Sequence, residues 1–115
     1  MLLKINKNSF NVKVLIESSE TSQGMMNKTF DDFDGMLFIM GDGSHSFWMM
    51  NCIIPLDIIF IDKNFKINKI HHYCEPCEVQ PCERFVGKGM YVLELEGGTC
   101  EDLGIREGQV CEFFK

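Results

Sequence analysis

Short β-rich runs separated by polar turn residues recur along the whole chain, and they constrain its fold more than any other feature. Residues 36–40 are continuously apolar, as expected for a strand that is buried on both faces, whereas residues 11–17 and 90–96 alternate between apolar and polar side chains. Runs of this length predict strands, and several of them in a short chain predict a sandwich or a barrel. Further runs of the same kind span residues 57–62, 66–72 and 110–114.

Helix signals are weaker than strand signals in this sequence. Residues 19–27 could form a short helix with a Ser or Thr cap, and residues 99–103 begin with the cap residue Thr99, carry acids in the first turn and end before Gly104. The chain has 115 residues without a repeat or a linker. We therefore expect one compact domain over residues 1–115, mainly β, barrel-like or sandwich-like, with one or two short helices.

The charge of the chain argues against two classes of partner. Its formal net charge is −6, and its Lys and Arg residues are scattered singly. Nucleic acids and anionic membrane surfaces both need a basic patch, so we expect neither as a partner. The sequence shows no signal segment and no run of roughly 18 apolar residues, which predicts a cytoplasmic protein. Its six cysteines are then expected to be mostly free thiols or metal ligands.

The segment from Phe47 to Asp57 is the strongest candidate for a binding site. It contains the only Trp of the chain, Trp48, together with Asn51, Pro55 and Asp57. Because Pro55 disfavours helix at the residue before it, we expect a loop carried by the sheet, where binding groups are common. Trp48, Asn51 and Asp57 could offer an aromatic surface, an amide and a carboxylate to a ligand. They could equally fill the core, bond the loop backbone and cap a turn.

Glu94 supports a second, catalytic hypothesis. In the alternating run, Glu94 falls on the face opposite Leu93 and Leu95. If it shared a cleft with Asp57, the two carboxyl groups could act as an acid–base pair in a hydrolase. The simpler alternative is that Glu94 faces solvent or pairs with a lysine.

Cysteines and methionines support a third, metal-based hypothesis. Cys74, Cys77 and Cys82 lie close in sequence beside two histidines, and thiolates with imidazole are typical zinc ligands. A fourth ligand would have to come from His71, His72 or a distant cysteine. Methionine thioethers can bind Cu(I), but the clustered methionines here are more typical of core packing. The Ser44–Ser46 segment follows Gly and Asp residues and is predicted to be a turn.

Several motifs together resemble a known family. Gly35-Met36-Leu37-Phe38, Trp48-Met49-x-Asn51, Pro55-Leu56-Asp57 and Tyr91-Val92-Leu93-Glu94-Leu95 occur in the order and at the spacing of the family called domain of unknown function 192, over roughly residues 12–114. The resemblance implies a compact, mainly β single domain and no established reaction. It also places Cys77 and Cys82 at family positions, which adds a disulfide between them to the alternatives.

The hypothesis that we favour from the sequence is a domain that binds a small polar ligand or a protein loop near Trp48, Asn51, Asp57 and Glu94. The acid–base hydrolase and the metal-stabilised module with Cys74, Cys77 and Cys82 remain the alternatives. The sequence identifies neither a cofactor nor an enzymatic activity.

Overall fold

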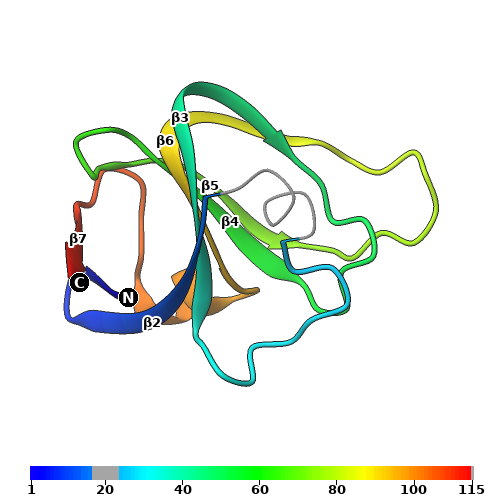
Figure 1. Cartoon of the computed structure of the whole chain (residues 1–115), viewed down its shortest axis with the longest axis horizontal. Helices are drawn as coiled ribbons and strands as arrows, with labels where there is room; N and C mark the ends of the chain where they lie inside the picture. Colours follow the sequence, from blue (N-terminus) through cyan, green and yellow to red (C-terminus); the bar gives the residue numbers. More distant parts are fainter. Residues whose placement is uncertain (17–23, 115) are drawn as a thin grey trace.

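A computed structural model describes residues 1–16 and 24–114 of the chain and shows seven strands in one curled sheet (Figure 1). The order of the strands across the sheet is β5-β4-β6-β3-β2-β1-β7. Only β2 and β3 run parallel; every other neighbouring pair is antiparallel. The strands are β1 (Leu2–Ile5), β2 (Asn8–Leu15), β3 (Gly35–Phe47), β4 (Leu56–Ile61), β5 (Ile67–Cys74), β6 (Phe85–Glu96) and β7 (Cys111–Phe114), and the helix α2 spans Thr99–Leu103.

The two ends of the sheet curl toward each other to form a half-barrel. Lys66, just before β5, forms an isolated antiparallel bridge with Val110, just before β7. Next to this bridge, the Cys111 N–H donates to the Phe65 carbonyl over 2.7 Å, and the Gly108 N–H donates to the Ile67 carbonyl over 2.8 Å. These backbone bonds connect the segments that lead into the two outermost strands.

Two hydrophobic cores lie on opposite faces of the sheet, because successive side chains of a strand point to opposite sides. The inner core fills the concave face of the half-barrel, and the outer core lies under the long loops that join the strands. The inner core is built from residues such as Leu3, Leu37, Ile59, Leu93 and Leu95. The outer core includes Met36, Phe38, Ile58, Phe60 and Val92.

The central strands β3 and β6 form a long ribbon that bends over the outer core. Their register shifts between Ile39 and Gly43, which marks a bulge. Beyond the bulge, Gly87 lies so close to Phe60 that a Cβ on Gly87 would come within 2.5 Å of the ring. A glycine is therefore required where the ribbon crosses β4. The predicted turn at Ser44–Ser46 is wrong, since these residues continue β3 after the bulge.

Most sequence-predicted elements are confirmed. All six predicted strands exist, and α2 spans the predicted residues, with Gly104 at its C-terminus in the left-handed conformation. Strand β1 was not predicted. The helix expected over residues 19–27 falls mostly outside the described residues, and its last four residues form turns and an isolated bridge. Over residues 1–16 and 24–114, no helix has the length and the apolar character needed to cross a membrane.

Candidate functional site

A pocket of about 470 Å³ lies over the outer core. Its floor comes from the central strands β3 and β6, and its walls come from the loops that follow and precede these strands. The lining is mostly aromatic and sulfur-containing, and it includes one acidic and one basic side chain. The lining residues are Gly24, Met25, Met26, Phe38, Met40, Ser46, Phe47, Trp48, Cys52, Arg84 and Glu94.

Glu94 lines this pocket from the middle of the sheet. On β6 it is paired with Met36 of β3 on one side and with Ile58 of β4 on the other, and both are core residues. Its side chain is 4% exposed, and over residues 1–16 and 24–114 its Oε1 atom has no hydrogen-bond partner. Burial away from water raises the pKa of Glu94 from 4.5 to about 8. Buried polar groups are nearly always hydrogen-bonded, so an orphan oxygen beside a cavity indicates a missing partner.

Trp48 and Arg84 meet in the wall of the pocket. The Arg84 guanidinium carbon lies 4.3 Å from the centre of the Trp48 ring, a cation–π contact. Deeper in the wall, the rings of Phe38 and Phe47 pack edge to face with their centroids 5.2 Å apart. The pocket therefore combines apolar surface with one acidic and one basic side chain, a composition typical of small-molecule sites.

The thiol of Cys52 also lines the pocket but is poorly suited to nucleophilic chemistry. Burial, with a smaller contribution from the negative charge of Glu94, raises the pKa of Cys52 to about 12. The thiolate is the reactive form of cysteine, and at neutral pH almost none of it would be present. Cys52 therefore acts as a small apolar wall residue of the pocket.

The loops around the pocket are joined to each other through their backbones. The Asn51 N–H donates to the Cys77 carbonyl over 2.9 Å, and the Asn51 carbonyl accepts from the Asn27 N–H over 2.9 Å. Asn51 has a φ of 59°, a conformation that Asn adopts more readily than most residues. Asn51 does not line the pocket, and its contribution is to hold three loops together.

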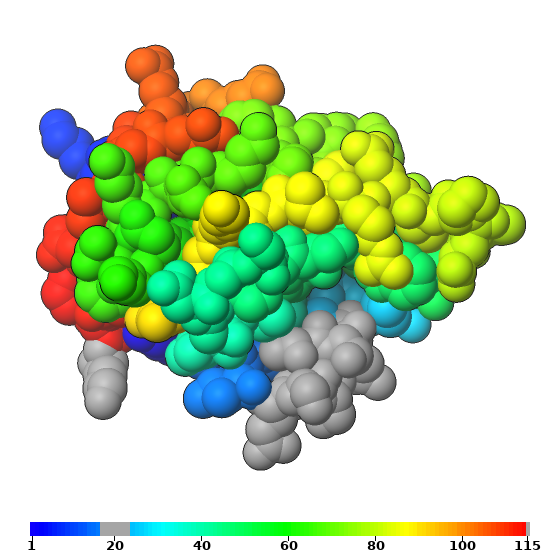
Figure 2. Space-filling view, turned by 90° about the horizontal axis from the view of Figure 1, so that it is seen from above, coloured from blue at the N-terminus to red at the C-terminus, as the bar shows by residue number. Residues whose placement is uncertain are grey.

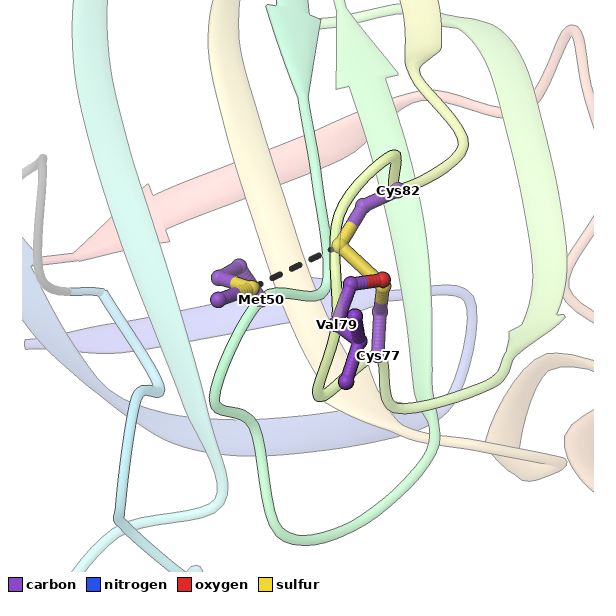
Figure 3. The surroundings of a disulfide bond; sticks show 4 residues. All are labelled: Met50, Cys77, Val79 and Cys82. Atoms are coloured by element: carbon purple, nitrogen blue, oxygen red, sulfur yellow. Dashed lines mark hydrogen bonds between the residues drawn. A yellow bond between two sulfur atoms is a disulfide. The ribbon is translucent and has the colours of Figure 1, made fainter.

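A disulfide closes the loop that carries Arg84. Cys77 and Cys82 are bonded with their Cα atoms 5.9 Å apart, and the Cys82 sulfur contacts the Met50 sulfur at 3.5 Å (Figure 3). Met50 also forms a parallel bridge with Cys77. This loop, coloured yellow-green, projects from the body at one end of the molecule (Figures 1 and 2).

Asp57 is fully buried and serves the scaffold. Its Oδ1 accepts the N–H of Tyr73 at 2.8 Å and of Gly98 at 3.2 Å, and its Oδ2 accepts the N–H of Cys100 at 2.9 Å. It thus satisfies backbone donors at the start of α2, where the N-cap Gly98 supplies no side chain. The predicted cap Thr99 is replaced by a carboxylate from β4.

The structure separates the two carboxyl groups of the hydrolase hypothesis. Asp57 is paired in register with Leu95 of the inner core, whereas Glu94 is paired with Ile58 of the outer core. Side chains of paired residues share a face, so Asp57 and Glu94 lie on opposite faces of the sheet. The predicted acid–base pair is therefore wrong.

The predicted metal set is not brought together either. Cys77 and Cys82 are bonded to each other, and Cys74 is buried in the outer core. Across residues 1–16 and 24–114, no group of three or more His, Cys, Asp or Glu side chains could hold a metal ion. Of the predicted ligand-binding residues, the pocket unites Trp48 and Glu94 but not Asn51 and Asp57.

Several pocket residues were missed by sequence reasoning. Phe38 and Phe47 belong to apolar stretches whose periodicity predicts only burial, and Arg84 stands alone between the cysteine-rich segment and β6. No local pattern indicates that Arg84 folds back over Trp48, since the two are 36 positions apart in the sequence. The signals that the sequence did offer were the only Trp, Trp48, and an acidic residue, Glu94, in the alternating run of β6.

The fold and the pocket describe a half-barrel β domain that carries a buried carboxyl group under its loops. Comparison with known proteins identifies the family. Residues 1–113 match the model of the uncharacterised ACR family, domain of unknown function 192, and the chain belongs to this family, as its motifs predicted.

Two solved structures are similar to this chain. One is a protein of unknown function from Novosphingobium aromaticivorans, with 30% sequence identity and a TM-score of 0.83, aligned over 92% of this chain and 76% of that one. The other, from Sinorhizobium meliloti, is described as a candidate transcription regulator, with 28% identity and a TM-score of 0.85, aligned over 96% and 89%. No curated protein matches.

Proposed function

We propose that this domain binds a small organic amine in the pocket over Glu94. The observation that carries the proposal is Glu94, which lines the pocket and whose buried Oε1 has no hydrogen-bond partner among the residues that the structure describes. A protonated amine supplies donors, and its charge forms a stronger hydrogen bond to a carboxylate than a neutral donor does. The net charge of −6 adds a general attraction for cations.

The remaining wall residues favour a ligand with an apolar body. Phe38, Phe47 and Met25 offer no charge, and desolvation of an alkyl or aryl group against them contributes about 25 cal/mol per Å². The site is a concave pocket rather than a flat surface, which favours a small molecule over the protein loop that the sequence left open.

The proposal predicts a distinctive pH dependence. With a pKa of about 8, Glu94 is mostly protonated at pH 6 and half ionised at pH 8. An amine that binds the carboxylate should therefore bind roughly 50-fold more tightly at pH 8 than at pH 6. Two titratable thiols near Glu94, Cys52 and Cys74, have pKa values raised to about 12, so neither changes ionisation over this range.

The test is a titration with 3-methylbutylamine, read from the fluorescence of Trp48, the only Trp of the chain. We expect saturable binding that tightens from pH 6 to pH 8 and weakens at least tenfold in Glu94→Gln. Glu96→Gln is the matched control, because it makes the same change at an exposed position of the same strand. Equal affinity in wild type and Glu94→Gln would overturn the proposal.

A further inference from the structure

We propose that the ligand is a zwitterion of the α-amino-acid type, with its amine at Glu94, its acid group at Arg84 and an apolar side chain between the aromatic walls. This inference rests on the proposed function and adds a second charged group to the ligand. It starts from the fact that one pocket is lined by a single acidic and a single basic side chain, among the residues that the structure describes.

The two charged groups of the pocket do not neutralise each other. Glu94 lies at the floor, and none of the described residues, Arg84 included, donates a hydrogen bond to its Oε1. Arg84 instead lies at the rim on Trp48. An acidic and a basic group that line one cavity without pairing are, once the acid is ionised, complementary to a ligand that carries both charges in the reverse order.

The contact with Trp48 leaves Arg84 able to bind an anion. A guanidinium uses its flat face in a cation–π contact and its N–H edges in hydrogen bonds to a carboxylate, frequently two at once. The ring reduces the freedom of the long Arg84 side chain before a ligand arrives, which lowers the entropic cost of binding. The exposed position of Arg84 at the pocket mouth makes its contribution smaller than that of buried Glu94.

The apolar residues that line the same pocket select the rest of the ligand. Phe38, Phe47, Met25 and Met40 line the space beside Glu94 and present no charged group. A polar side chain there would lose its hydration without gaining a partner. Leucine is the probe of choice, because 3-methylbutylamine is leucine without its carboxylate and 4-methylpentanoate is leucine without its amine.

The experiment compares these three probes by isothermal titration calorimetry at pH 8. We expect leucine to bind about tenfold more tightly than 3-methylbutylamine and 4-methylpentanoate to bind weakest. Arg84→Gln should remove the advantage of leucine over 3-methylbutylamine, so that the two probes bind with similar affinity. Arg106→Gln, a change at the only other arginine and outside this pocket, is the matched control.

The outcomes separate this inference from the proposed function. If 3-methylbutylamine binds through Glu94 but leucine binds no better, or if Arg84→Gln weakens both probes equally, the zwitterion is wrong while the amine site stands. If neither leucine nor 3-methylbutylamine binds the wild-type protein, both proposals fail. Circular dichroism of each variant distinguishes a lost contact from a lost fold.

Discussion

At the scale of single residues, two buried carboxyl groups show how environment assigns opposite roles to similar side chains. Asp57 accepts three backbone N–H groups, whereas one oxygen of Glu94 has no hydrogen-bond partner in the part of the chain that the structure describes. A fully bonded carboxylate stabilises a fold, and an orphan carboxyl group weakens it. The first belongs to the scaffold and the second to the candidate site.

Glu94 should make the stability of the folded protein depend on pH. Its pKa is about 8 in the folded state and near 4.5 when unfolded, so between these values the unfolded chain holds fewer protons. Stability should therefore fall as pH rises through this window, by about 3 kcal/mol between pH 5 and pH 8. Urea unfolding of wild type and Glu94→Gln at both pH values checks this. The variant should lack the decrease, and parallel curves for both proteins would contradict it.

Asp57→Asn should destabilise the fold without acting directly on the pocket. The amide cannot accept at both of its ends, so at least one backbone N–H at the start of α2 loses its acceptor, at a cost of about 1–3 kcal/mol. The free energy of unfolding in guanidinium chloride measures this. Asp102→Asn, in the same helix but exposed, is the control. A loss of amine binding in folded Asp57→Asn would instead return Asp57 to the site.

At the scale of elements, the loop that the Cys77–Cys82 disulfide closes helps to shape one wall of the pocket. The Cys77 backbone is hydrogen-bonded to the backbones of Met49 and Asn51, and the disulfide ring ends two residues before Arg84.

The disulfide is also relevant to the predicted reducing environment, because disulfides persist mainly in oxidising compartments. Cytoplasmic location stays a prediction from the sequence.

Removal of the disulfide should loosen this loop and cost stability. For the short ring between Cys77 and Cys82, the chain-entropy relation gives roughly 2 kcal/mol. We expect the Cys77→Ser/Cys82→Ser variant to unfold at a correspondingly lower denaturant concentration and to show altered Trp48 fluorescence as Arg84 becomes less fixed. The control is a reductant, which should shift the wild type toward the variant and leave the variant unchanged. Identical unfolding of both proteins would contradict the prediction.

At the scale of the whole molecule, the half-barrel depends on contacts between the two ends of the sheet. These contacts join the segment before β5 to the segment before β7, more than 40 positions apart. They close the half-barrel around the inner core on the side where α2 and β7 contribute buried residues to that core. Closure also reduces the length of free strand edge, which protects a sheet from pairing with other chains.

The amides that close the sheet should exchange slowly with solvent. The N–H groups of Ile67, Gly108 and Cys111 each donate to a backbone carbonyl across the closure. If the sheet opens only on unfolding, their exchange should be as slow as that of central amides such as Leu93, because all then require the same opening. Hydrogen–deuterium exchange read by NMR measures this. Fast exchange at all three positions, with slow exchange at Leu93, would show that the half-barrel opens independently.

The sequence by itself determined the mainly β class, six of the seven strands, the short helix and the family, because strand periodicity, turn residues and motif spacing are local properties. It also identified Trp48 and Glu94, each of which stands out in its own segment. Only the tertiary structure decided that Asp57 and Glu94 lie on opposite faces, that Asn51 connects loops, and that Arg84 joins Trp48 at the pocket. Those outcomes depend on strand register and on loops that meet across long sequence separations, and no local pattern encodes either.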